Sequence, residues 1–225
     1  MLISIFESIE SSTEPEDLVC YGYDASGLDG TPALVVWPKN TDEVVKVMKY
    51  ASGKRMSVVP RGAGTGMTGG SVPAKGAIVM SFEKMDRAIE IDTENLDAVV
   101  EPGLINGRLQ RQLADLGLFY PPDPSSLDFC TLGGNVAENA GGPRALKYGV
   151  TRDYVMELEA VLPSGDVITT GVRTRKSVVG YDLTRLLTGS EGTLAVITRI
   201  RFRVIPAPEE IVTLLASFDN VVESG

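Results

Sequence analysis

The sequence predicts an α+β fold, in which helices flank sheets. The first third of the chain reads as strand, helix, strand, glycine-rich loop and strand, and the last third consists mostly of predicted strands. The chain has 225 residues, of which 43% are hydrophobic and 23% charged. This length and composition suffice for one large domain or two small lobes around a substantial core.

One amphipathic helix separates the first two predicted strands. Residues 33–37 are an apolar run typical of a buried strand. Thr41 is predicted to cap the helix, with acidic residues in its first turn, and Gly53 is predicted to end it. Residues 57–59 and 77–81 are predicted to form the next two strands.

A glycine-rich stretch, residues 58–70, joins those two strands with the sequence VVPRGAGTGMTGG. Glycine loses more conformational entropy on folding than any other residue, so five glycines in nine positions need a physical reason. The usual reason is that bare backbone N–H groups surround an anion, most often a phosphate. The alternative is a flexible linker. Flexible linkers combine glycine with serine and polar neighbours, whereas this stretch follows the apolar run Val-Val-Pro.

Residues 64–69 also fit the pattern G-x-G-x-x-G of dinucleotide-binding folds. In those folds the third glycine opens a helix whose N-terminus holds the diphosphate. Here residues 70–76 include a proline and another glycine and leave no room for a helix before the next strand. The sequence therefore disfavours a Rossmann fold, and it contains no Walker A motif.

The middle of the chain predicts two short strands and a helix. Residues 88–92 and 98–100 are predicted to be strands on either side of a polar turn. A helix is predicted to begin at Asn106, to carry a stripe of three leucines that ends at Leu116, and to stop at Gly117.

A second cluster of small residues, Thr131–Gly142, follows a proline-rich segment, Pro121–Ser126. Such residues allow a ligand to approach the backbone closely. The alternative is a small helix packed on a sheet, and the proline segment alone indicates only a rigid connector. Two glycine clusters in one chain favour a ligand-binding site.

The last third predicts a hairpin, a short helix and a long strand. Residues 154–162 and 167–170 are predicted strands joined by a Pro-Ser-Gly-Asp turn, and residues 182–187 a helix. In the strand 194–204, apolar residues alternate with three arginines that we expect to be solvated or to meet a partner, rather than to bind substrate. These are Arg199, Arg201 and Arg203.

Several classes of function are disfavoured by composition. The net charge is −9 with no basic run, so nucleic acid is not an expected partner. The chain has no histidine, which excludes Ser-His-Asp and Cys-His catalysis, histidine-based zinc sites and a histidyl bond to a cofactor. Two cysteines, no signal peptide and no apolar run near 20 residues make a cytoplasmic protein the default expectation.

Four segments in order resemble the FAD-linked oxidases with a vanillyl-alcohol-oxidase-type (PCMH-type) FAD-binding domain. They are Pro60–Gly70, Pro121–Ser126, Thr131–Gly142 and Gly189–Thr198. The nearest members are the D-lactate and D-2-hydroxyglutarate dehydrogenases and the flavin subunit of bacterial glycolate oxidase. Two further segments match the same group: Leu146–Val155 and Gly180–Leu183.

The resemblance implies a two-lobed α+β domain over residues 1–208, with FAD lying extended between the lobes. Lobe one, about residues 17–92, would hold a small, partly parallel sheet, and lobe two, about residues 93–208, a mainly antiparallel sheet. Residues 209–225 would begin a C-terminal cap domain that the chain does not contain. We expect either a truncated chain or a split subunit.

The resemblance also implies which residues bind FAD without a covalent bond. The glycine loop would wrap the diphosphate with backbone amides, and the other segments would line the rest of the cofactor. The implied residues are Pro60, Arg61, Gly62, Ala63, Gly64, Thr65, Gly66, Met67, Pro122, Asp123, Pro124, Thr131, Gly133, Gly134, Ala137, Asn139, Gly141, Glu191, Gly192 and Ile197. No catalytic or metal-binding residue is expected within the chain, and a divalent metal would need the cap domain.

The function implied by the resemblance is oxidation of a D-2-hydroxy acid (D-lactate, glycolate or 2-hydroxyglutarate) to the 2-oxo acid by hydride transfer to FAD. The expected partners are FAD, the hydroxy acid, an electron acceptor, and other subunits or a second copy of the chain. The chain alone is expected to be inactive. Two alternatives remain: a non-catalytic FAD-binding subunit of a multi-chain oxidoreductase, and a relative of the NADPH-dependent enolpyruvyl reductases.

Overall fold

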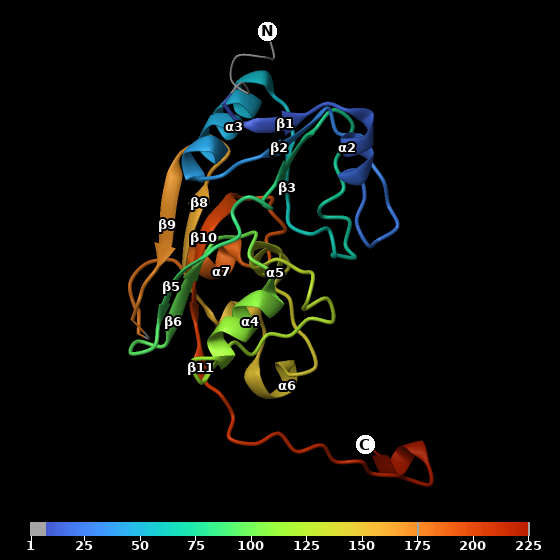
Figure 1. The fold of residues 1–225 in the computed structure, drawn as a ribbon, viewed down its shortest axis with the longest axis vertical. Coiled ribbons are helices and arrows are strands. Elements are labelled where there is room, and N and C mark those ends of the chain that lie inside the picture. Colours follow the sequence, from blue (N-terminus) through green and yellow to red (C-terminus); the bar gives the residue numbers. More distant parts are fainter. Residues whose placement is uncertain (1–7, 175, 225) are drawn as a thin grey trace.

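The computed structural model describes residues 8–174 and 176–224, which form two main sheets (Figure 1). The first sheet has the order β1-β2-β4-β3. Strands β2, β4 and β3 are parallel, and β1 pairs with β2 in the antiparallel sense. Its members are β1 (Glu10–Ser12), β2 (Leu34–Trp37), β3 (Val58–Arg61) and β4 (Ile78–Ser81). This is the small, partly parallel sheet that the resemblance implied.

Helix α3 (Thr41–Lys54) covers this sheet with an apolar face whose central residues are buried. The predicted boundaries were each wrong by one residue. Asn40, not Thr41, is the N-cap, because its extended backbone lets Asn40 Oδ1 accept the N–H of Glu43 at 3.0 Å. The helix runs past Gly53 and ends at Lys54, where Arg55 adopts a left-handed conformation with φ 53°.

The second sheet is entirely antiparallel, with the order β5-β6-β10-β8-β9. Its members are β5 (Ala88–Asp92), β6 (Asp97–Val100), β8 (Val155–Val161), β9 (Val167–Gly171) and β10 (Val196–Arg203). Strand β5 pairs with β6, so the boundary between the sheets lies between residues 81 and 88. The predicted lobe boundary at residue 92 placed β5 in the wrong sheet.

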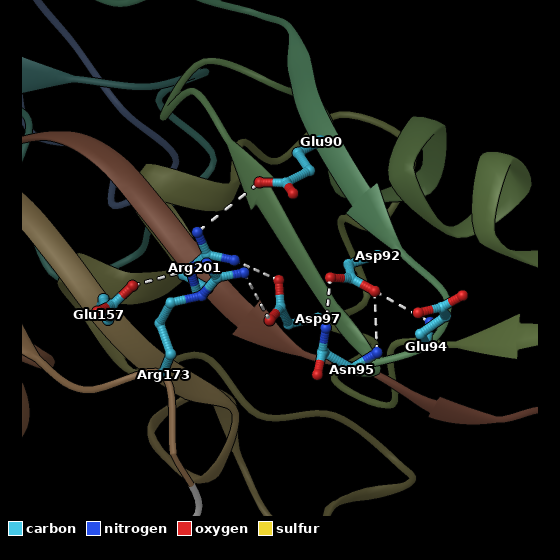
Figure 2. Close-up of polar contacts among 8 residues, drawn as sticks. All are labelled: Glu90, Asp92, Glu94, Asn95, Asp97, Glu157, Arg173 and Arg201. Atoms are coloured by element: carbon cyan, nitrogen blue, oxygen red, sulfur yellow. Dashed lines mark hydrogen bonds and ion pairs between the residues drawn. The ribbon is translucent and has the colours of Figure 1, made fainter.

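The arginines of β10 do not form one solvated face, which was the first of the two alternatives predicted for them. Arg201 donates to Glu157 at 2.8 Å and to Asp97, and it also faces Glu90 (Figure 2). The Arg201 side chain is 13% exposed and that of Asp97 only 3%. The guanidinium of Arg203 lies over the ring of Tyr154. Only Arg199 is largely solvated, beside Glu159.

Helices cover the core side of the second sheet. Helix α4 (Asn106–Ala114) buries Leu109 and Leu113 in this core. It ends before the third predicted leucine, Leu116, which is exposed. Ile105 is its N-cap, and Asn106 instead donates from its amide to the carbonyl of Pro122 at 3.2 Å.

Three shorter helices and a small strand pair complete this half of the molecule. They are α5 (Leu132–Glu138), α6 (Ala145–Tyr148), α7 (Leu183–Leu187) and the antiparallel strands β7 (Leu118–Phe119) and β11 (Ile205–Pro206). The cluster at 131–142 therefore does contain a small helix packed on the sheet, α5, which contacts β10. One-turn η1 (Thr151–Asp153) precedes β8.

The two sheets share part of one core. Val161 at the end of β8 and Val196 at the start of β10 pack into the same apolar cluster as α3 and β4. Figure 1 shows α3 above the upper ends of β8 and β9. The two halves are therefore held together where the end of β8 and the start of β10 meet α3 and β4.

The ends of the chain lie outside these cores. Helix α2 (Pro15–Cys20) follows β1, and residues 1–7 lie outside the described residues. Residues 207–220 extend from the body to η2 (Val221–Ser224) without forming a helix or strand (Figure 1). Within residues 8–174 and 176–224, no helix is long and apolar enough to cross a bilayer.

Candidate functional site

A cleft of about 680 Å³ lies between the glycine-rich loop that follows β3 and helix α5. Four segments that are distant in the sequence line it: the loop, the proline segment, the α5 region and the turn before β10. The predicted clusters thus face each other across one cavity. Its volume lies within the range of about 300–1,000 Å³ usual for small-molecule and cofactor sites.

The glycine-rich loop presents free backbone donors. From Gly62 to Ser71, no backbone N–H donates a hydrogen bond to another group in the part of the chain that the structure describes. Strand β4, not a helix, follows the loop, as predicted from the residues after Gly70. Successive unpaired N–H groups in a loop form a concave site for an anion.

The side chain of Arg61 supports this loop from within and does not reach across the cleft. A Cβ on Gly64 would lie 2.2 Å from Arg61 Nη2, and Gly64 has φ +67°. Only glycine allows both that backbone conformation and that approach. Arg61 is 6% exposed and donates from Nη1 to the carbonyl of Tyr23 at 2.6 Å. Its guanidinium is therefore committed to the protein.

The two walls of the cleft touch at Gly62 and Thr131. A Cβ on residue 62 would lie 2.1 Å from Thr131 Oγ1, which explains the glycine there. Thr131 is the N-cap of α5, and its hydroxyl oxygen accepts the N–H of Gly134 at 3.2 Å. The first N–H groups of α5 are thus used within the protein, since those of Leu132 and Gly133 donate to residues 104 and 102.

The turn before β10 is fixed by the C-terminal end of α5. The N–H groups of Gly189 and Glu191 both donate at 2.9 Å, to the carbonyls of Val136 and Ala137. Glu191 has φ 53°, which is unusual for a residue other than glycine. These bonds hold the strained turn in place and direct Glu191 toward the cleft.

Two carboxylates approach the end of the glycine loop. The space beside Gly70 is bounded by Glu138 Oε1 and Glu191 Oε2, and Thr68 Oγ1 donates to Glu138 at 3.2 Å. Burial raises the pKa of the Glu138 carboxyl, and the charges of Glu191 and Asp24 add to this increase, while the Thr68 hydrogen bond opposes it. These carboxylates favour hydroxyl or amide donors, not phosphate oxygens, as neighbours.

All but three of the residues that the resemblance implied line this cleft. The exceptions are committed elsewhere. The carbonyl of Pro122 accepts from Asn106 and Gln110, and Asp123 pairs with Arg144 at 3.1 Å. Asn139 Oδ1 accepts the N–H of Arg152 at 2.9 Å.

The structure also adds lining residues that the sequence analysis did not single out. The most informative is Asn135, which is buried and whose Nδ2 has no hydrogen-bond partner among the described residues. Its place within the second glycine cluster was the only available signal. The other added residues are Gly70, Ser71, Phe82, Pro102, Ser125, Ser126, Cys130, Glu138, Ala140, Gly142, Pro143 and Ala195.

Comparison with known families decides what kind of cleft this is. Residues 32–171 match the family model described as FAD binding domain. The chain belongs to this family. The match covers the glycine loop, the proline segment and α5, so three of the four segments that line the cleft lie inside it. FAD is therefore the cofactor class of this domain, as the resemblance implied.

Two relatives show where the chain lies among the FAD-binding proteins. It is 50% identical over 202 residues to the glycolate oxidase subunit GlcD of Bacillus subtilis, which covers 89% of the chain and 43% of that protein. It is 37% identical over 219 residues to a D-lactate dehydrogenase of Anaerostipes hadrus, covering 97% of the chain and 45% of that protein. The chain thus spans less than half the length of these relatives.

A solved structure confirms the fold of this FAD-binding domain. Alkyldihydroxyacetonephosphate synthase superimposes on 89% of the chain with a TM-score of 0.79, at 23% sequence identity and over 38% of its own length. At that identity the match supports only the architecture. The predicted two-sheet α+β fold is therefore confirmed.

Proposed function

We propose that FAD binds in the cleft between the glycine loop and α5, with its diphosphate against the loop. The observation that carries this proposal is the run of unpaired N–H groups from Gly62 to Ser71. These donors can stabilise a diphosphate by hydrogen bonds without any cationic side chain. This matters because Arg61, the one Lys or Arg among the described residues that line the cleft, is already engaged by the carbonyl of Tyr23.

Other features of the cleft fit the remaining parts of the cofactor. Asn135 Nδ2 is a buried donor without a partner among the described residues, so a ligand oxygen would satisfy it. Glu138 and Glu191 can accept from the hydroxyl groups of a ribityl chain or ribose. Within the described residues, no group of three or more Cys, Asp or Glu side chains could hold a metal ion.

We propose further that the whole protein oxidises a 2-hydroxy acid of the lactate or glycolate type to the 2-oxo acid. The names of the two relatives support this substrate class. Bound FAD supplies the hydride acceptor for such an oxidation. The residues of this chain bind and orient the cofactor, while groups that bind the substrate come from the part of the whole protein beyond these residues.

A ligand titration tests the binding proposal. FAD, ADP and riboflavin are added separately to the purified chain, and binding is followed by flavin fluorescence and by the thermal unfolding midpoint. We expect saturable binding of FAD and of ADP, because both carry the diphosphate, and weaker binding of riboflavin. If FAD at concentrations up to about 1 mM does not raise the unfolding midpoint, any binding has a dissociation constant above about 1 mM, which corresponds to a binding free energy of about −4 kcal/mol. That result would contradict the proposal.

A second candidate function is a non-catalytic FAD-binding subunit of a multi-chain oxidoreductase. It is favoured by the exposed apolar residues of one surface loop, where Val178, Val179 and Tyr181 are each at least 80% exposed. The relative named as a glycolate oxidase subunit is consistent with an assembly. Oxidation of a hydroxy acid by the purified whole protein, with no second polypeptide present, would exclude this candidate.

A further inference from the structure

The segment Tyr21–Gly30, here termed the anchor segment, lies directly behind the glycine loop. The N–H of Ala25 donates to the carbonyl of Gly66 at 3.0 Å, and Leu28 packs beside Gly69. The segment folds back on itself, since the N–H of Gly30 donates to the carbonyl of Gly22 at 2.7 Å. It precedes the residues that match the FAD-binding family, which begin at residue 32.

Arg61 connects the anchor segment to both ends of the loop. Arg61 is the last residue of β3, directly before the loop. Its Nη1 donates to the carbonyl of Tyr23 at 2.6 Å and to Ser71 Oγ at 3.4 Å. Ser71 lies where the loop ends. The guanidinium therefore joins the first and last residues of the loop, and Gly64 rests on it between them.

Asp24 completes this connection from the anchor segment. It is 5% exposed, and Ser71 Oγ donates to its Oδ2 at 3.4 Å. Its Oδ1 accepts both the N–H of Ser26 at 2.8 Å and the Ser26 hydroxyl. The orientation of Asp24 is thus fixed by its own segment, and Asp24 in turn fixes Ser71.

The charges of Asp24 and Arg61 also complement each other. Burial lowers the pKa of the Arg61 guanidinium, and the negative charge of Asp24 opposes this decrease. Although burial disfavours ionisation of Asp24, its bonds from Ser26 and Ser71 and the charge of Arg61 hold its pKa below the usual value. Removing the Asp24 charge would leave a buried guanidinium poorly compensated.

We propose that Asp24 is a positioning residue of the cofactor site, which fixes Arg61 and Ser71 and thereby the shape of the glycine loop between them. This inference rests on the proposed FAD-binding function. Among the described residues, Asp24 makes no hydrogen bond across the cleft, where only its charge is felt, through the pKa of Glu138. Its effect on the shape of the loop passes through Arg61 and Ser71. The loop amides point together toward an anion only while the two ends of the loop are held.

The test replaces Asp24 with Asn, which keeps the shape of the side chain but removes its charge. The matched control is Asp29→Asn in the same segment, where the carboxylate is exposed and makes no ion pair among the described residues. We expect the dissociation constants of FAD and ADP to rise by the same factor, about tenfold, in Asp24→Asn. The Asp29→Asn control should stay within about twofold of the unsubstituted chain.

Hydrogen exchange provides a readout that a loss of overall stability would not reproduce. In the ligand-free Asp24→Asn chain, the amides of residues 21–30 and 62–72 should exchange faster, while those of β8 and β10 remain unchanged. If Asp24→Asn does not fold, Ser71→Ala, which removes only the connecting hydroxyl, should give the same local pattern and a smaller loss of affinity.

Unchanged FAD affinity and unchanged exchange in a folded Asp24→Asn chain would overturn the inference, as would equal effects in the Asp29→Asn control. These outcomes differ from failure of the proposed function. If the unsubstituted chain binds neither FAD nor ADP, the proposed function fails, whereas the exchange comparison still tests whether Asp24 shapes the loop.

Discussion

Gly62 and Thr131 are in contact across the cleft, so closely that a Cβ on residue 62 would lie 2.1 Å from Thr131 Oγ1. This contact joins the glycine loop of the first sheet to the N-cap of α5 on the second. The cofactor cleft therefore depends on a glycine that has no direct role in catalysis.

The first prediction concerns Gly62→Ala. The added methyl group must displace Thr131, so we expect a loss of about 1–3 kcal/mol in the free energy of unfolding and weaker FAD binding, measured by denaturant unfolding and by titration. Gly53→Ala is the control, because nothing lies within 4 Å of a Cβ at that position in α3. It should be neutral or slightly stabilising.

A double-mutant cycle decides whether the effect arises from this contact. Thr131→Ala removes the hydroxyl that obstructs a methyl group at residue 62, at the expense of the α5 N-cap. The double variant should lose less stability than the sum of the two single losses. If the stability losses of the two single variants simply add in the double variant, Gly62→Ala does not act through its contact with Thr131.

The second prediction is a pH dependence that Glu138→Gln abolishes. The pKa of Glu138 is raised in the folded chain, chiefly by burial, so the folded state binds more protons than the unfolded state just above the usual glutamate pKa. The free energy of unfolding should therefore fall as pH rises from the usual glutamate pKa through the raised pKa, and Glu138→Gln should lack this part of the decrease.

The same carboxyl should link FAD binding to proton uptake. A diphosphate held by the loop amides would not contact Glu138, but its negative charge in the same cleft would raise the pKa of Glu138 further, because like charges disfavour ionisation. FAD affinity should therefore increase as pH is lowered toward the usual glutamate pKa in the unsubstituted chain and change less in Glu138→Gln. Identical pH profiles for the two proteins would show that the bound diphosphate does not influence Glu138.

The third prediction concerns Arg201→Met. This change leaves Asp97, whose side chain is 3% exposed, without its main cationic partner (Figure 2). We expect a loss of about 3 kcal/mol in unfolding free energy, measured by urea denaturation, with little change in FAD affinity. Arg199→Met on the same strand is the control, since Arg199 is half exposed and lies 3.7 Å from Glu159, so that this pair should contribute less than about 1 kcal/mol. Equal losses of unfolding free energy in the two variants would show that the buried ion pair of Arg201 and Asp97 contributes no more than the exposed arginine.

The fourth prediction concerns residues 209–224, which extend from the body. Their described apolar side chains, such as Leu214 at 88% and Leu215 at 95% exposure, make no part of either core. Deleting residues 209–225 should leave the thermal unfolding midpoint within about 2 °C, because little surface is buried there. A larger decrease would show that this segment packs on the domain.

The sequence was sufficient to predict the features that depend on local composition. Each of these features is visible in a short stretch of the sequence. They are the two glycine clusters, the strand after Gly70 and the alternation of apolar residues in β10. The opposition of the clusters across one cleft followed from the resemblance to a family, not from spacing, since residues 62 and 131 are far apart along the chain.

Side-chain roles that depend on distant contacts could not be predicted. Arg61 was expected only as part of the loop backbone, because nothing in the sequence places Tyr23 and Asp24 behind it. Arg201 was expected to be solvated or to meet a partner, because strand alternation reveals the face of a residue but not the carboxylates on neighbouring strands. Pro122 and Asn139 were expected in the cleft, but their polar groups bond to other elements.

A crystal structure of the chain grown with FAD would show whether the loop amides hold the diphosphate. We expect diphosphate oxygens within hydrogen-bond distance, about 2.7–3.2 Å, of backbone N–H groups between Gly62 and Ser71. We also expect an oxygen of FAD near Asn135 Nδ2 and an Arg61 side chain still bonded to Tyr23. FAD bound at another surface, or a diphosphate held by cationic side chains with the loop amides unpaired, would contradict this binding mode.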